Sequence, residues 1–285
     1  MHSPPPEPTE DADMEDTRPL RISVIICTWN RSGLLVRTLE QLTRLEEPEA
    51  EWELIVVDNN CTDDTPAVLS RYADRLPLTV VQESTPGLSN ARNAGLAVAD
   101  CDYVVWTDDD VLVDPDWLRA YEDAFRRYPD AAFFGGPIRP FMDQAAPEWF
   151  DTALHEMGAG FIWAVLDLGP DEIPLGGRRL PFGANMAYRR ADLPENPFDP
   201  RLGRMEDQLL AGEETALMSH LAGLGLEGRW IPGATVEHYV PGERLTLDYV
   251  RRWWVGHGKA QAALKAPSGR VSLAGIPSWL ATEYL

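Results

Sequence analysis

The chain has 285 residues, 44% of them hydrophobic, and a formal net charge of −21. This length and composition allow a sizeable core, built either as one large α/β domain or as a domain with an appendage. The acidic charge argues against nucleic acid as a partner, because no basic stripe is present to neutralise phosphates.

The first 19 residues are rich in Pro, Glu and Asp and contain no apolar run, which predicts a disordered acidic tail. The longest apolar stretch, residues 157–166, is far shorter than the roughly 18 residues that suggest a membrane span. Three scattered cysteines without metal-ligand spacing are typical of a reducing compartment. We therefore expect a cytoplasmic protein, either soluble or held peripherally at the inner face of the membrane.

The segment from residue 20 to residue 137 alternates strand and helix patterns. Residues 21–27 form a near-continuous β-branched run, as expected for a strand covered on both faces. Further strands are predicted over residues 53–57, 78–82, 103–107 and 131–135, with amphipathic helices over residues 34–45, 62–76, 88–97 and 117–125. Such βαβ alternation predicts a doubly wound, mainly parallel sheet.

Three consecutive carboxylates, Asp108, Asp109 and Asp110, follow the strand predicted at residues 103–107. Side chains alternate across a strand, so Asp108 and Asp110 can face one way while Asp109 faces the other. Two converging carboxylates repel each other unless a cation neutralises them, and Mg²⁺ or Mn²⁺ completed by substrate phosphates is the expected occupant. The structural alternative is a polar turn that caps a helix beginning near Pro115.

Polar residues follow three of the predicted strands, at the edge of the sheet where ligands bind in such folds. They are Thr28, Asn30 and Arg31 after the first strand, Asp58 and Asn59 after the second, and the three aspartates after the fourth. One ligand could touch all three sets. Because no G-x-G-x-x-G or Walker A sequence follows the first strand, a dinucleotide site and a P-loop are both disfavoured.

An ordered set of motifs resembles the family 2 glycosyltransferases of the GT-A fold. The motifs are VIICTWNR (24–31), IVVDNNCTDDT (55–65), PGLSNARNAG (86–95), TDDD (107–110), FGANMAYRR (182–190), GEET (212–215) and VEHY (236–239). The resemblance covers about residues 21–265. It implies a nucleotide-sugar-binding α/β half at residues 20–137, an acceptor-binding half at 138–242 and a C-terminal helical extension at 243–285.

The activity implied by the resemblance is metal-assisted transfer of a sugar, with inversion, from a nucleotide-diphosphate sugar to an acceptor hydroxyl. A UDP-sugar is favoured over a GDP-sugar, and the acceptor class is a saccharide, a lipid-linked compound or a small molecule. The leaving diphosphate needs its developing charge neutralised, which is the task of the Mn²⁺ or Mg²⁺ ion.

On the donor side, the resemblance implies that Asp110 binds the metal and that Asp108 lies near the ribose or the metal. Thr28, Asn30, Arg31 and Asp109 are expected around the nucleotide sugar, with Asp58 accepting a hydrogen bond from the base and Arg92 lining the base or diphosphate pocket. The structural alternatives are strand-end caps for Thr28 and Asp58, a helix-start charge for Arg31 and a surface position for Arg92.

His238 is similar in position to a third metal ligand or diphosphate contact of several GT-A enzymes, although a lone His near a strand end is often structural. On the acceptor side, Gly183 and Asn185 belong to a small-residue segment that would allow close backbone approach to the donor sugar. An ordinary tight turn is the alternative for that segment.

Glu213 and Glu214 precede a predicted helix with Leu217, Leu221 and Leu224 on its buried side. The family's usual pair here is Glu-Asp, and its second acid is the catalytic base, so the resemblance implies that Glu214 is the base and Glu213 its neighbour on the acceptor side. The helix N-terminus is expected to keep Glu214 ionised, although the helix dipole alone would also favour two acids there.

Residues 245–264 predict a helix with aromatic and basic character. Arg252-Trp253 is similar to part of the Gln-x-x-Arg-Trp signature of processive synthases, but the Gln is missing, which favours single-sugar addition. Trp253 is expected to close the acceptor cleft, to touch a membrane surface or to pack against the catalytic domain.

Two other classes of protein remain open. A nucleotidyltransferase on a similar sheet also needs acidic metal ligands, but usually has a basic, Gly-rich loop near the first strand, where residues 27–32 offer only Arg31. A non-catalytic nucleotide- or carbohydrate-binding protein would keep the fold without turnover, and Glu in place of Asp at residue 214 leaves that reading open.

Overall fold

A computed structural model of the chain describes residues 18–177, 179–202 and 212–264. Residues 1–17 of the predicted tail and residues 265–285 of the predicted C-terminal extension lie outside the described residues. The main feature is an eight-stranded sheet with the strand order β3-β2-β1-β4-β9-β6-β10-β8. Its strands are β1 (Arg21–Thr28), β2 (Glu51–Asp58), β3 (Leu78–Gln82), β4 (Tyr103–Asp108), β6 (Phe133–Gly135), β8 (Pro174–Leu175), β9 (Asn185–Arg189) and β10 (Gly228–Trp230).

The mainly parallel arrangement predicted from the sequence is confirmed. Strand β1 pairs in parallel with β2 and β4, and β2 pairs in parallel with β3. Strand β9 runs antiparallel between β4 and β6, and β8 is antiparallel to β10 at the edge. The carboxyl ends of β1, β2 and β4 therefore meet at one edge of the sheet, as the ligand-binding argument requires.

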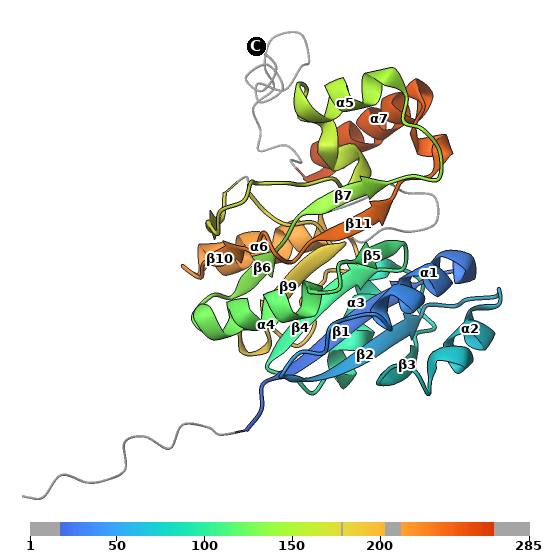
Figure 1. The fold of residues 1–285 in the computed structure, drawn as a ribbon. Coiled ribbons are helices and arrows are strands. Elements are labelled where there is room, and N and C mark those ends of the chain that lie inside the picture. The colour runs from blue at the N-terminus through green and yellow to red at the C-terminus, as the bar shows by residue number, and fades with distance from the viewer. Residues whose placement is uncertain (1–17, 178, 203–211, 265–285) are drawn as a thin grey trace, which may run out of the picture.

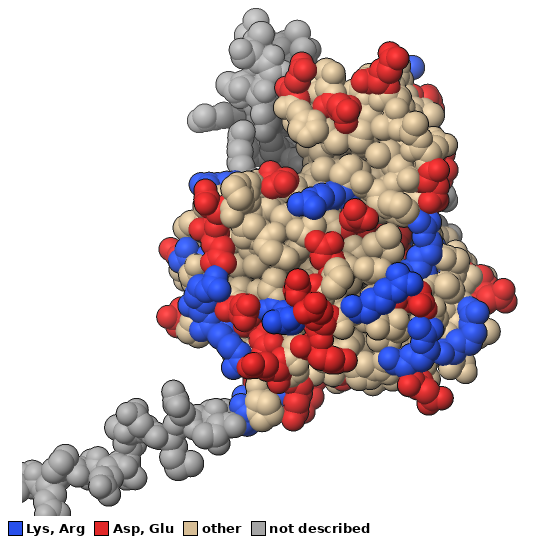
Figure 2. Space-filling view, in the orientation of Figure 1, with Lys and Arg blue, Asp and Glu red and all other residues tan. Residues whose placement is uncertain are grey.

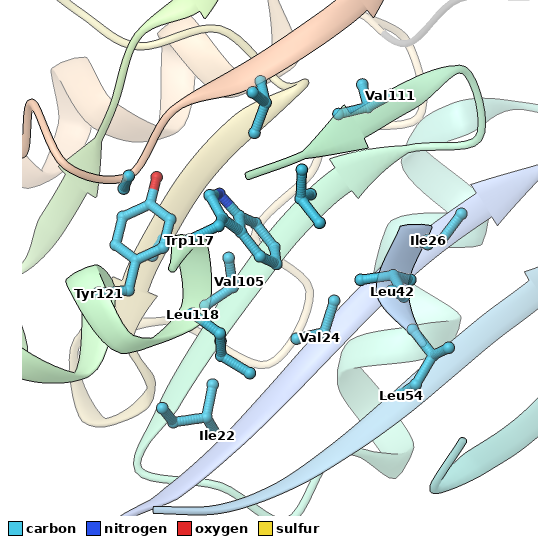
Figure 3. Packing of buried hydrophobic residues seen from close by; sticks show 14 of the residues in the cluster. Ile22, Val24, Ile26, Leu42, Leu54, Val105, Val111, Trp117, Leu118 and Tyr121 are labelled. Carbon is cyan, nitrogen blue, oxygen red and sulfur yellow. The ribbon is translucent and has the colours of Figure 1, made fainter. Parts of the chain in front are cut away.

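Helices cover both faces of this sheet (Figure 1). One face packs against α1 (Ser32–Leu42), α2 (Thr65–Tyr72) and α4 (Trp117–Arg127), and the other against α3 (Leu88–Val98) and α6 (Glu213–Gly223). The alternation of side chains along β1 explains this double cover, because Val24 and Ile26 belong to the first core while Ile25 belongs to the second. Figure 3 shows Val24 and Ile26 on the same side of β1 as Leu42 of α1 and Leu118 of α4.

A small three-stranded sheet that the sequence did not predict stands beside the main one. Strand β11 (Val236–Tyr239) lies between β5 (Val111–Val113) and β7 (Ile138–Phe141). Each of these strands is only three or four residues long, too short for a period-two pattern to be read from the sequence. This sheet matters for function, because it carries the segment that contains His238 back to the three aspartates.

A third layer, at the top of Figure 1, contains α5 (Glu148–His155) and α7 (Leu247–Leu264). Short 3-10 helices lie at Ala159–Trp163, Arg190–Asp192 and Gly242–Arg244. Phe150, Trp163, Val240 and Leu245 form the buried centre of this layer, so residues of the expected acceptor-binding half and of the C-terminal helix share one small core. Within the described residues, no helix is both long and apolar enough to cross a membrane.

Candidate active site

The loops that follow β1 and β2 are tied to each other by hydrogen bonds. The backbone N of Asn59 donates to the carbonyl of Thr28 at 3.0 Å, and Asn30 Oδ1 accepts from Thr62 N at 2.7 Å. Asn30 has a left-handed backbone with a φ of 52°, which Asn tolerates better than most residues. Asn30 is exposed, as a nucleotide contact would be, and its side chain also holds the two loops together.

Asp58 ends β2 as a buried carboxylate at the same edge. Its Oδ1 accepts from Cys61 N at 2.8 Å, and its Oδ2 accepts from the side-chain amide of Gln82 at 3.0 Å. Each carboxylate oxygen has a second lone pair, so Asp58 can still accept one more hydrogen bond. Gln82, the register partner of Asp58 at the end of β3, was not singled out in the sequence, because a Gln at a strand end carries no signal by itself.

Asp109 is the buried centre of the acidic triplet. It accepts hydrogen bonds from Thr28 Oγ1 at 2.8 Å and from Arg31 Nη1 at 2.9 Å. The same Arg31 nitrogen donates to Asp110 Oδ2 at 2.8 Å. Burial raises the pKa of the Asp109 carboxyl to about 7, while the Arg31 guanidinium works in the opposite direction.

Thr28 was expected as a nucleotide contact. Its side chain is buried and its hydroxyl donates to Asp109, so the side chain supports the acidic triplet. Arg31, whose side chain is 38% exposed, is turned toward the aspartates and not away from the site as a helix-start charge would be.

Asp108, Asp110 and His238 form the one group that could hold a metal ion among the described residues. One ligand atom from each lies within 4.8 Å of the others, and His238 Nε2 is 3.5 Å from Asp110 Oδ1. Strand β11 pairs antiparallel with β5 so that His238 stands opposite Val111, one residue after Asp110. The tertiary structure thus joins a histidine to two aspartates more than 120 residues away in the chain.

The residues present fit a divalent metal ion. His238 is buried, and its Nδ1 has no hydrogen-bond partner within the described part of the chain. Two carboxylates and one imidazole suit Mn²⁺ better than Mg²⁺, which prefers oxygen ligands. Asp108 and Asp110 lie together in this group while Asp109 bonds to Thr28, but β4 ends at Asp108, so a turn and not the alternation of a strand produces this grouping.

Glu213 and Glu214 are the first two residues of α6, and they have different surroundings. Glu213 is buried, and its Oε1 accepts from Arg92 Nη1 at 2.7 Å. Glu214 is half-buried, and its Oε2 atom is enclosed without a hydrogen-bond partner among the described residues. Glu214 is therefore the acid of the pair whose carboxylate can receive a proton.

Burial raises the pKa of Glu214 to about 7, the negative charge of Glu213 adds to the effect, and Arg92 opposes it. The helix N-terminus was expected to keep this side chain ionised, but burial and the neighbouring acid outweigh the helix dipole. A carboxylate with a pKa near neutrality is better matched to proton transfer than one with an ordinary pKa.

Arg92 is buried, and does not lie at the surface as its structural alternative predicted. Its side chain is 3% exposed, with its guanidinium carbon 5.3 Å from the centre of the Phe198 ring. A Cβ atom on Gly183 would lie 2.1 Å from Arg92 Nη2. The small residue at position 183 therefore makes room for a side chain of the protein itself.

Asn185 was expected on the acceptor side through close approach of its backbone, and its side chain lies in the core. The residue is fully buried, and its Oδ1 accepts from Trp117 Nε1 at 3.0 Å and from Tyr121 OH at 2.8 Å. Its Nδ2 donates to the carbonyls of Pro137 and Ala234. All four hydrogen-bonding positions of the amide are used inside the core, so Asn185 is structural.

Trp253 lies on α7, with its ring centre 5.0 Å from that of Phe161. It is partly buried against the core of the third layer, which agrees with the packing alternative. The neighbouring Trp254 is 42% exposed.

Comparison with known proteins gives a consistent family. Residues 23–206 match the family model described as glycosyl transferase family 2. Validoxylamine A glucosyltransferase of Streptomyces hygroscopicus subsp. limoneus is 35% identical over 101 residues, which are 35% of this chain and 22% of that protein. The poly(ribitol-phosphate) β-N-acetylglucosaminyltransferase TarS of Staphylococcus aureus (strain Mu50) is 30% identical over 102 residues, which are 35% of this chain and 18% of TarS.

Solved structures share the fold at low sequence identity. The S. aureus TarS 1-349 structure has a TM-score of 0.54 and 20% identity to this chain. The match covers 83% of this chain and 65% of the TarS 1-349 chain. The mannosyltransferase PcManGT from Pyrobaculum calidifontis, in complex with GDP-Man and Mn²⁺, has a TM-score of 0.58 and 23% identity, and covers 89% of this chain and 67% of that one. These likenesses show a GT-A type fold.

Proposed function

Because the chain belongs to glycosyl transferase family 2, we propose that it moves a single sugar from a nucleoside diphosphate sugar to an acceptor hydroxyl, with inversion at the anomeric carbon. One observation carries the proposal: a single buried arginine interacts with the acid pair and with one of the metal-ligand residues. Arg92, which is paired with Glu213, also interacts electrostatically with Glu214 and with Asp108. The acceptor-activating acid and the metal ligands are thus close enough to act on one donor molecule.

The donor in this proposal is a UDP-sugar, with a GDP-sugar as the alternative. Asp58 lies at the end of β2, and its carboxylate has lone pairs left that could accept a hydrogen bond from the ring N–H of uracil or guanine. TarS has been solved in complex with UDP-GlcNAc, and PcManGT in complex with GDP-Man. The acceptor is a saccharide, a lipid-linked compound or a small molecule.

Asp108, Asp110 and His238 would hold Mn²⁺, with Mg²⁺ as the alternative. The ion would neutralise the negative charge that develops on the leaving diphosphate. Arg31 bonds to Asp109 and Asp110 and so lowers the net negative charge of the site before the diphosphate arrives.

In the proposed step, Glu214 accepts the proton of the acceptor hydroxyl. The acceptor oxygen forms a bond to the anomeric carbon as the bond from that carbon to the diphosphate oxygen breaks. The bonding electrons leave with the nucleoside diphosphate, and attack from the opposite side inverts the anomeric configuration. Glu213 is bound to Arg92 and takes no part in the proton transfer of this proposal.

Incubation of the purified chain with a panel of UDP- and GDP-sugars, acceptors and Mn²⁺ tests this function. Release of a nucleoside diphosphate that depends on the acceptor is the expected result. Release of pyrophosphate in the presence of a nucleoside triphosphate would identify a nucleotidyltransferase, and nucleotide binding without release would identify a binding protein.

Calorimetric titration with UDP or GDP tests the metal role separately from turnover. We expect Asp110→Asn to weaken Mn²⁺-dependent nucleotide binding by at least about 10- to 100-fold, the cost of disturbing a metal site. Asp116→Asn, at a 69% exposed side chain on the N-terminal side of α4, is the matched control and should bind like the wild type. Equal affinity with Mn²⁺ and with EDTA would contradict the metal role.

A further inference from the structure

Arg92 is a buried cation held in one arrangement by protein groups alone. Its side chain and that of Glu213 are each only 3% exposed, and they form a 2.7 Å ion pair between α3 and α6. The guanidinium also lies 5.3 Å from the ring centre of Phe198. A charge taken out of water in this way is tolerated only with a partner in good geometry, so Arg92 and Glu213 constrain each other.

Gly183 provides the space that the Arg92 guanidinium occupies. A Cβ at this position would lie 2.1 Å from Arg92 Nη2, which is a clash, and 3.2 Å from Cζ, which is a tight contact. Gly183 is absent from the glycines with positive φ, so its backbone conformation does not require glycine. The requirement for glycine at residue 183 is therefore steric, and the group that imposes it is Arg92.

The environment of the acid pair contains two carboxylates and one cation. The titratable or charged groups that act on Glu214 are Glu213 on its own helix, Arg92 on α3 and Tyr188 on β9. Arg92 donates to Glu213, whereas Glu214 Oε2 has no hydrogen-bond partner within the described residues. Arg92 therefore acts on Glu213 through a hydrogen bond and on Glu214 only through space.

We infer that Arg92 is a positioning residue for acceptor activation: it binds Glu213 in a buried ion pair and leaves Glu214 as the acid that exchanges a proton, while Gly183 admits its guanidinium. The catalytic meaning of this inference rests on the proposed function. The inference assigns Arg92 to the acid pair, in place of the base or diphosphate pocket where the family resemblance put it.

The first test replaces Arg92 by Met, which keeps length and removes charge. Loss of an opposite charge at this range shifts a carboxyl pKa by about 1 to 3 units. We therefore expect the acidic limb of the kcat/KM profile to move upward by about that amount in Arg92→Met, with Mn²⁺-dependent UDP affinity unchanged. Arg92→Lys should move it less, and Arg119→Met, at an exposed ion pair on α4, should not move it.

The second test removes no charge. Gly183→Ala should displace the Arg92 guanidinium and move the acidic limb of the kcat/KM profile upward, as in Arg92→Met. Gly223→Ala, where a Cβ meets nothing within 4 Å, should leave the acidic limb unchanged. In an Arg92→Met background, Gly183→Ala should produce no further shift, because the side chain that it displaces is gone. The absence of a further shift separates a specific coupling from general damage to the fold. If Arg92→Met fails to fold, the single variants Gly183→Ala and Arg92→Lys still show whether the acidic limb moves.

A titration of the glutamate carboxyl groups by ¹³C NMR, with Glu214→Gln to assign the resonance, measures the pair without turnover. A Glu214 midpoint that rises in Arg92→Met and in Gly183→Ala supports the inference even if no donor is ever transferred, so the two proposals can fail separately. An unchanged midpoint in both folded variants overturns it. A loss of UDP affinity with an unchanged Glu214 midpoint also overturns the inference, and would indicate that Arg92 lines the nucleotide pocket.

Discussion

Glu213 and Glu214 are neighbours in the chain, yet their partners divide the chemistry between them. Glu213 is buried in an ion pair, while Glu214 has an enclosed oxygen without a hydrogen-bond partner in the described structure. A carboxylate already bound by a guanidinium is a poor proton acceptor, because protonation would sacrifice the charge-assisted hydrogen bond. In the proposed mechanism, the difference in partners, and not the position on the helix, makes Glu214 the base.

Substitution of each acid by Gln separates catalysis from stability. Glu214→Gln should lower kcat by about 10²- to 10⁴-fold, the usual contribution of a general base, and leave the fold and nucleotide binding intact. Glu213→Gln should act mainly on stability, because Arg92 loses its buried counter-charge; we expect a loss of about 2 kcal/mol, since Gln still accepts a hydrogen bond. Steady-state kinetics and urea denaturation of both variants measure the two effects, and reversed kinetic effects would make Glu213 the base.

The pH dependence follows from the pKa of Glu214, which burial raises to about 7. The base must be ionised, so kcat/KM should rise with pH through about 7 and level off above it. The folded state binds this proton more tightly than the unfolded chain, so the contribution of Glu214 to stability is largest at acid pH and falls as the pH rises toward 7. Glu214→Gln, neutral at every pH, should gain in melting temperature relative to the wild type between pH 5 and pH 8, and a constant difference would contradict the raised pKa.

At the scale of elements, the site depends on how closely α3 lies on the central strands. Gly95 of α3 faces β1 and β2, and a Cβ there would be 2.7 Å from Ile25 Cγ2 and 3.0 Å from Val57 Cγ2. The missing side chain lets the helix approach the sheet, and Arg92 sits one turn earlier on the same helix. The close approach of α3 to the sheet therefore also sets the position of the guanidinium that holds Glu213.

Gly95→Ala tests this close approach. Overpacking costs about 1 to 3 kcal/mol, against a gain of up to about 1 kcal/mol from helix propensity, so we expect a net loss in unfolding free energy. Gly223→Ala, in α6 with open space around its Cβ, should gain up to about 1 kcal/mol. Urea denaturation measures the unfolding free energy of the two variants. Equal gains in both would show that α3 does not lie too close to the sheet for a methyl group at residue 95.

At the scale of the whole molecule, the charge is strongly negative but not segregated on the visible face. Figure 2 shows acidic residues and arginines interspersed over the part built on the main sheet, with many tan residues over the upper layer. All but two of the 25 basic residues are arginine, and several form ion pairs with carboxylates far away in the chain, such as Arg37 with Asp143 and Arg127 with Glu172. The excess of 46 acidic over 25 basic residues remains, and it repels itself.

Added salt should therefore stabilise the fold. The Debye length falls from about 10 Å at 0.1 M to about 3 Å at 1 M salt, which screens the excess negative charge. We expect the melting temperature to rise from low to molar KCl, as in a salt-adapted protein. A flat or falling curve would instead leave a GC-rich genome as the explanation of the acidic, arginine-rich composition.

The sequence by itself determined the elements and residues whose signals are local. The strands β1 to β4 and the helices between them were predicted within a few residues, because burial on one or both faces leaves a periodic pattern in consecutive residues. The convergence of Asp58 and the aspartates followed from parallel strands ending at one edge. The motifs around these residues also sufficed to identify the glycosyltransferase family.

Only the tertiary structure decided which distant residues meet. His238 reaches Asp108 and Asp110 through β5 and β11, strands too short to leave a pattern, and Arg92 meets Glu213 across 121 residues of chain. The motifs gave no sign that the side chains of Thr28 and Asn185 are buried and bonded to other residues of the protein. A motif reports residue type and spacing, whereas the partner of a buried polar side chain depends on how whole elements pack, which no local pattern contains.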